Sequence, residues 1–94
     1  MSSPMNRYGA QAMTHWKERK PQAFGELDNP EEFFAELGEE ISTEIETRAR
    51  DLAGQEPDGE GYLQRLQRLN TSRLTAEGEV LRERVLLDVE PDQE

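Results

Sequence analysis

The stretch from Asn29 to Gly54 constrains the fold of this chain more than any other part of the sequence. Asn29 is a favoured N-cap residue, Pro30 suits the first helical position, and Glu32 lies where a capping box needs a carboxylate. The apolar residues that recur at helical intervals after this cap are Phe34, Leu37, Ile41, Ile45 and Leu52. Gly54 is a favoured residue just beyond a helix C-terminus. The pattern predicts an amphipathic helix over residues 30–53, about 36 Å long at 1.5 Å per residue.

A second long helix is predicted after a polar turn. Residues 55–61, QEPDGEG, contain one proline and two glycines that break the helical pattern. Apolar residues then recur from about Tyr62 to Asp88. Asn70 interrupts this apolar stripe and Gly78 weakens the helix interior, which would allow a kink or break between residues 70 and 78. Gly38 in the first long helix carries a similar cost, roughly 0.5–1 kcal/mol relative to alanine, unless close packing requires it.

The first 25 residues have a pattern of their own. Met5, Tyr8, Ala12 and Trp16 recur at three- and four-residue intervals, which predicts a short helix. Pro21 should end that helix at about Lys20, because the residue before a proline avoids the helical conformation. A helix this short is marginal in water, so it needs the rest of the chain or a partner to hold it.

These elements predict an all-α fold, in which two long helices form an antiparallel αα-hairpin and a short N-terminal helix lies across it. The expected divisions are a basic, aromatic N-terminal segment over 1–28, an acidic helical hairpin over 29–90 and an acidic tail over 91–94. A two-helix hairpin hides only one face of each helix. We therefore expect dimerisation or docking onto a larger protein.

The net charge of −10 is unevenly distributed along the chain. Residues 1–25 carry four basic side chains and one acidic side chain, a balance of 4 − 1 = +3, whereas residues 26–94 carry 7 − 20 = −13. Such an acidic body would repel the DNA backbone, which argues against general nucleic-acid binding. The sequence contains no run of about 18 apolar residues that could span a membrane. The first twenty residues lack an apolar signal region, so a cytoplasmic location is expected.

The acidic residues of the first long helix are the first candidate site. Glu32, Glu36, Glu40 and Glu44 recur every four residues and should form a row along one side of the helix, which Glu39 broadens. One interpretation is an ordinary solvated face, partly neutralised by arginines such as Arg48. The other is a partner-binding face that occupies a basic groove made for nucleic acid. The candidate acidic residues are Glu32, Glu36, Glu39, Glu40 and Glu44.

The aromatic and basic residues of the N-terminal segment are the second candidate site. Tryptophan, tyrosine and arginine are enriched at the centres of protein interfaces, and aromatic rings among cations can also stack on nucleic-acid bases. The same rings could instead complete the hydrophobic core. The candidate residues, which include the two phenylalanines of the neighbouring helix, are Tyr8, Trp16, Lys17, Arg19, Lys20, Phe33 and Phe34.

Catalytic chemistry is not indicated. The chain has no cysteine and a single histidine, His15, so it lacks a thiolate nucleophile, a thiolate zinc site and a paired histidine base. The turn at 55–61 lacks both the twelve-residue calcium-binding pattern and the Lys-Ser/Thr ending of a phosphate-binding loop. We expect no enzyme activity, no metal and no cofactor.

Four strings carry a resemblance to a known group of proteins: HWKERKP, NPEEFFAELG, RARDLAG and GEGYLQRLQRLN. With them the chain resembles small acidic helical accessory proteins of actinobacterial phages and mobile elements. The resemblance implies a cytoplasmic protein that works on a nucleic-acid-handling machine.

The sequence thus predicts a non-enzymatic protein-binding module. Its acidic helical face would dock on a basic surface of a larger, nucleic-acid-handling protein as an inhibitor or modulator, acting as a nucleic-acid decoy. The alternatives are a self-associating helical subunit, including a homodimer, and a small DNA-binding regulator that uses the basic N-terminal segment. The second alternative is the less favoured, because only four positive charges stand against the acidic body.

Overall fold

The computed structural model describes residues 4–86 and is helical, with no strand in that range. Its elements are α1 (Arg7–Arg19), α2 (Pro21–Gly25), α3 (Pro30–Ala53), α4 (Tyr62–Leu81) and a π-helical turn, η1 (Arg82–Leu86). The predicted all-α class is confirmed. The end of the second long helix near Asp88 and the tail at 91–94 lie outside the described residues.

The helix ends follow from local chemistry. Asn6 caps α1, because its Oδ1 accepts a hydrogen bond of 2.9 Å from the Gly9 N–H. Asn29 caps α3 in the same way, accepting at 3.3 Å from the Glu32 N–H while its own side-chain amide donates to the Glu32 carboxylate. Gly54 follows the last turn of α3 with φ of 65°, a conformation that glycine adopts without steric cost. The predicted bounds of this helix, 30–53, are confirmed.

The two helices on either side of α3 are also close to the prediction. α1 ends at Arg19, and Pro21 begins the short helix α2, so the proline ends the first helix where expected. α4 runs without interruption from Tyr62 to Leu81, and neither Asn70 nor Gly78 breaks it. The helix then widens into the π-helical turn η1, which no sequence signal predicted.

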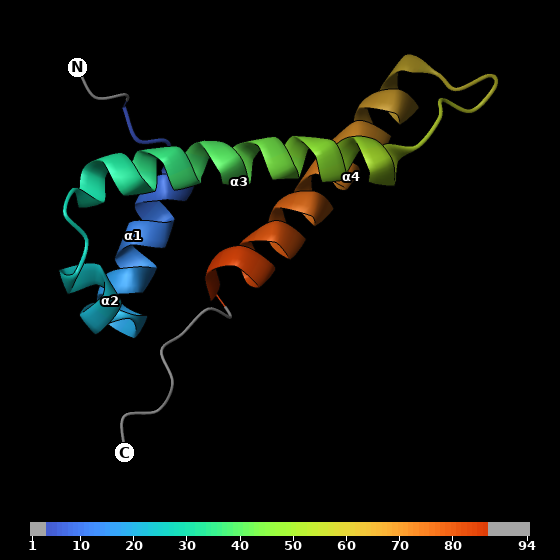
Figure 1. Cartoon of the computed structure of the whole chain (residues 1–94). Helices are drawn as coiled ribbons and strands as arrows, with labels where there is room; N and C mark the ends of the chain where they lie inside the picture. The colour runs from blue at the N-terminus through green and yellow to red at the C-terminus, as the bar shows by residue number, and fades with distance from the viewer. Residues whose placement is uncertain (1–3, 87–94) are drawn as a thin grey trace.

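α3 is the central element, and both α1 and α4 pack against it. Figure 1 shows α1 near the N-terminal half of α3 and α4 crossing α3 obliquely nearer its other end. The packing of α3 with α4 is established, whereas their arrangement as an antiparallel hairpin stays a prediction. No helix within residues 4–86 combines the length and the apolarity needed to cross a membrane.

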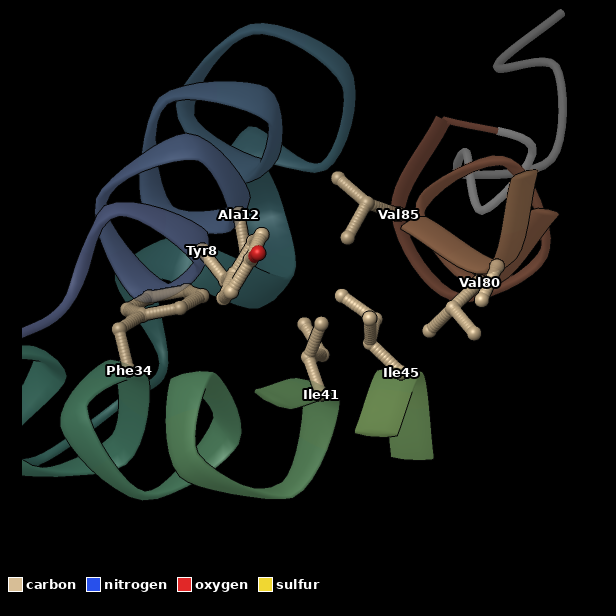
Figure 2. Packing of buried hydrophobic residues seen from close by; sticks show 8 residues of the cluster. Tyr8, Ala12, Phe34, Ile41, Ile45, Val80 and Val85 are labelled. Atoms are coloured by element: carbon tan, nitrogen blue, oxygen red, sulfur yellow. The ribbon is translucent and has the colours of Figure 1, made fainter. Parts of the chain in front are cut away.

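The hydrophobic core lies where three helices and η1 meet. Its buried members come from all four of these elements: Tyr8 and Ala12 of α1, Phe34, Ile41 and Ile45 of α3, Ala76 and Val80 of α4, and Val85 of η1. Figure 2 shows these side chains pointing towards one another from the surrounding helices. The predicted apolar stripe of α3 therefore faces both α1 and α4.

Two glycines set the distance between α1 and α3. A Cβ atom on Gly38 would lie 2.3 Å from Asn6 Oδ1 and 2.8 Å from the Gly9 nitrogen. A Cβ atom on Gly9 would lie 2.3 Å from the backbone oxygen of Phe34. The two helices touch backbone to backbone here, so close packing does require Gly38.

Candidate interaction surfaces

The acidic row of α3 is divided in two by the fold. Glu32, Glu36 and Glu39 are exposed, on the side of α3 away from the core. Among the described residues, no cation forms an ion pair with any of the three. We call the surface made by Glu32, Glu36 and Glu39 the acidic face. Residues 26–45 contain eight acidic side chains and no basic one, a balance of −8.

The other half of the row is neutralised within the molecule. Arg84 of η1 donates to Glu44 at 2.6 Å and to Glu40 at 3.4 Å. Arg48 also contacts Glu44, at 3.4 Å, and donates to both carboxylate oxygens of Glu83 at 2.9 and 3.0 Å. The Glu83 carboxylate is accordingly held at a pKa below its ordinary range by the hydrogen bonds from Arg48. Glu40 and Glu44 thus bind η1 through Arg84 and are not part of a free row of four charges.

A hollow of about 260 Å³ lies beside the acidic face. Leu27 and Phe33 supply its apolar walls, and Asp28, Glu32 and Glu36 supply carboxylates. The stem of a long basic side chain can pack along apolar surface while its charged head reaches carboxylate oxygens. We call this feature the acidic hollow.

The predicted aromatic site is an intramolecular cluster. The ring centroid of Trp16 lies 5.2 Å from that of Phe33 and 5.4 Å from that of Phe34, and Phe24 stacks on Phe34 at 6.0 Å. Phe34 is fully buried, whereas Trp16 and Phe33 are half-buried. Phe24 was not among the predicted site residues, although it stands among polar residues between α1 and α3. These rings hold α1 and α2 against α3.

Two lysines of the N-terminal segment lie over rings of this cluster. Lys20 Nζ is 3.8 Å from the Trp16 ring centroid, and Lys17 Nζ is 5.6 Å from that of Phe24. Arg19 is exposed. The structure therefore brings Lys17 and Lys20 together with aromatic residues, as the sequence suggested, but these rings belong to the protein's own fold.

Tyr8 lies in the same core as Phe34 and also makes polar contacts. Its ring is buried, and its hydroxyl donates a hydrogen bond of 2.7 Å to Glu77 of α4. Arg7 donates to the same hydroxyl at 2.9 Å and forms an ion pair with the same carboxylate. Tyr8 thus joins α1 to α4.

Sequence reasoning missed a third surface, formed by residues 46–73, which we call the loop end. A groove of about 460 Å³ separates the last turns of α3 from the first turns of α4. Ala49, Ala53 and Leu69 form its apolar part. The cations that line it are Arg50, Arg65, Arg68 and Arg73, and the anions are Glu46 and Glu56.

Arg68 fixes the shape of this groove. It donates to the backbone oxygen of Ala53 at 2.6 Å and to both carboxylate oxygens of Glu60 at 2.8 and 3.0 Å. These bonds join the end of α3, the connecting loop and α4. The pKa of Glu60 is lowered from its ordinary value, chiefly by the hydrogen bonds from Arg68. Arg65 lies 3.6 Å from Glu56, a second cross-link to the loop.

The apolar residues of the loop end are largely uncovered. Tyr62 and Leu63 are 74% and 71% exposed, and Leu52, Leu66 and Leu69 are roughly half-exposed. All five belong to the apolar stripes that the sequence predicts for the two long helices. Figure 1 shows α4 crossing α3 obliquely, so the first turns of α4 diverge from α3 beyond the crossing. The only signal in the sequence was the excess of apolar surface over what two helices can cover.

Within residues 4–86, no group of three or more His, Asp and Glu side chains is arranged to hold a metal ion. In comparisons with known proteins, no family model, curated protein or solved structure matches the chain.

Proposed function

We propose that this protein is a non-enzymatic binding module that docks the acidic face of α3 on a basic surface of a larger, nucleic-acid-handling protein. The acidic hollow is the observation that carries the proposal. Its apolar walls and its carboxylates, Asp28, Glu32 and Glu36, suit one arginine or lysine side chain of the partner. The module would inhibit or modulate the partner by occupying the place of nucleic acid.

Charge supports the approach of such a partner. Within residues 4–86, the cations that pair with the eight acidic side chains of residues 26–45 are Arg84 and Arg48, and in that segment they contact Glu40 and Glu44. A one-signed surface of this kind steers a basic partner and raises the association rate in a salt-dependent way. In this role α3 and α4 would act as the antiparallel hairpin expected from the sequence, and the protein would work in the cytoplasm.

A peptide with arginine at every fourth position tests the acidic hollow directly. Its affinity for the full chain is measured by fluorescence anisotropy across a salt series. The double variant Asp28→Asn/Glu36→Gln should weaken binding about fivefold or more and flatten the salt dependence, because two carboxylates of the hollow lose their charge. The matched control is Glu46→Gln, which removes one exposed charge of α3 outside the hollow. Equal affinity and equal salt slope in all three proteins would contradict the proposal.

The decoy mechanism needs a separate experiment. A basic nucleic-acid enzyme captured on the immobilised protein should be released by a DNA or RNA duplex as well as by salt. Release by salt together with full retention in the presence of excess duplex would rule out competition with nucleic acid.

A self-associating helical subunit is the second candidate. The exposed side chains of Leu63 and Leu74 on α4 favour it, because neither lines the groove at the loop end. Light scattering at tens of micromolar protein separates the two functions. A single species of monomer mass removes the second candidate and leaves the first intact.

A further inference from the structure

The loop end differs in charge from the rest of the molecule. Residues 46–73 contain five arginines and five acidic side chains, a balance of 5 − 5 = 0, in a chain whose net charge is −10. Four of those five arginines line the groove. Arg65 and Arg68 are paired with Glu56 and Glu60 of the loop, whereas no described residue forms an ion pair with Arg50 or Arg73. The groove therefore presents two uncommitted guanidinium groups beside an apolar lining.

The apolar part of the groove is suited to a close neighbour. Ala49 and Ala53 are small, so the backbone of a partner can approach α3 closely at these turns. Leu69 is roughly half-exposed on the facing side of α4. Uncovered apolar surface that adjoins charged groups is typical of a protein-binding site rather than of an ordinary monomer surface.

We propose that this groove binds an amphipathic helix of a partner protein whose apolar stripe is flanked by glutamate or aspartate. The apolar stripe would cover Ala49, Ala53 and Leu69, and the flanking carboxylates would accept hydrogen bonds from Arg50 and Arg73. The planar guanidinium group matches a carboxylate with two parallel hydrogen bonds, which gives both affinity and orientation. Helix-in-groove binding of this kind is a recurrent mode of peptide recognition.

Charge favours an acidic amphipathic helix in this groove over a nucleic acid or a second copy of this chain. A nucleic acid brings a dense row of phosphates, which the acidic body and the groove's own Glu46 and Glu56 would repel, whereas a helix brings only a few carboxylates. A second copy of this chain carries its own charge of −10, and the apolar stripe of its acidic helix α3 is already buried in its core. The site is separate from the acidic hollow and of opposite sign, so it stands independently of the proposed function.

Two synthetic peptides test the proposal with the full-length protein. Both form an amphipathic helix with a leucine stripe, and they differ only in having glutamate or lysine along its flanks. Fluorescence anisotropy should show saturable binding of the glutamate peptide. Amide chemical-shift changes in NMR spectra should then fall on residues 46–56 and 62–73. The lysine peptide should bind less tightly at this site, and any shifts that it causes at residues 27–40 report on the acidic hollow instead.

Charge reversal provides the decisive variant. Arg50→Glu/Arg73→Glu should weaken binding of the glutamate peptide at least tenfold, while circular dichroism confirms that the helices remain. Arg82→Glu, at an exposed arginine outside the groove, is the matched control and should leave that affinity unchanged. The proposal is overturned if the glutamate peptide does not bind, if it binds both variants equally, or if an oligonucleotide binds the groove more tightly. Concentration-dependent dimerisation that Leu69→Gln abolishes would also overturn it, by identifying a second copy as the occupant.

Discussion

The two ends of α3 are built from similar sequence and are covered very differently. In its first half, Phe34 and Ile41 are fully buried in the core that α3 forms with α1, α4 and η1. In its second half, Leu52 continues the same stripe but remains roughly half-exposed. The comparison shows that an apolar stripe marks where burial can occur, whereas the neighbouring elements decide whether it does. Of the apolar stripe of α3, the part around Leu52 is therefore the one still available to an apolar partner surface.

The largest expected difference in the free energy of unfolding is between a substitution in the core and a substitution at the loop end. Phe34→Ala removes a fully buried ring and should lower the free energy of unfolding by about 3–5 kcal/mol. Leu63→Ala, at a position 71% exposed, should change it by no more than about 0.5 kcal/mol. Urea denaturation followed by circular dichroism measures both. A loss of more than about 2 kcal/mol in Leu63→Ala would mean that the loop end is packed and that the comparison is wrong.

The next contrast uses the same substitution at two helical glycines. Gly38→Ala should destabilise by about 1–3 kcal/mol, because the added Cβ meets Asn6 and the backbone of Gly9. Gly78→Ala should stabilise by about 0.5–1 kcal/mol, since open space surrounds Gly78 and alanine favours the helix. Thermal denaturation of the two variants gives the sign of each change. Two changes of the same sign would contradict the close contact between α1 and α3.

A smaller effect on stability, and one that depends on pH, is expected at the loop end. Arg68→Met removes the cation that lowers the pKa of Glu60. A carboxylate with a lowered pKa stabilises the fold above its unfolded-state pKa, and that contribution is lost as the pH falls through the lowered folded value. The stability difference between wild type and variant should therefore be largest near pH 7 and shrink below about pH 4. The part that remains at low pH is the lost hydrogen bond to Ala53.

Arg65→Met is the matched control for that experiment. Its ion pair with Glu56 is longer, 3.6 Å, and more exposed, so its effect should be smaller at every pH. A stability difference for Arg68→Met that does not vary between pH 3 and pH 7 would mean that Glu60 makes no electrostatic contribution to the loop.

The smallest effect is expected on the acidic face. Glu36 has glutamates four residues away on both sides, Glu32 and Glu40, and like charges at this spacing destabilise a helix. Glu36→Gln should therefore raise the free energy of unfolding by about 0.2–0.5 kcal/mol at low salt, and the gain should vanish at high salt. Denaturation at two ionic strengths checks this. A loss of stability would point to a structural role for Glu36 and weaken the case for a face kept free for a partner.

Local signals in the sequence were sufficient to predict the helices. The caps at Asn29 and Gly54, the break at Pro21 and the apolar stripe of α3 each depend on residues within a few positions of one another, and the structure confirms all of them. The direction in which α4 crosses α3 depends instead on how whole surfaces fit, as does the backbone contact of α1 with α3 at Gly38. No local pattern carries that information.

The candidate sites were predictable only in part, for the same reason. Spacing predicted that Glu36 and Glu39 would lie along one side of α3, and both are exposed in the structure. It could not show that Arg84, forty residues from Glu44, would turn back to neutralise it. Spacing could not predict the groove at the loop end either, because the groove depends on how α3 and α4 diverge.

The placement of Trp16 has an experimental consequence. It is the only tryptophan in the chain, and its ring packs against Phe33 and Phe34 at the covered end of α3. Its fluorescence therefore reports on the docking of α1, while circular dichroism averages over every helix. If fluorescence and circular dichroism give the same unfolding curve, the protein unfolds as one cooperative unit. If the two curves have different midpoints, the two ends of α3 unfold in separate steps. Trp16 is thus an intrinsic fluorescent probe of the end of the protein where α1 packs on α3.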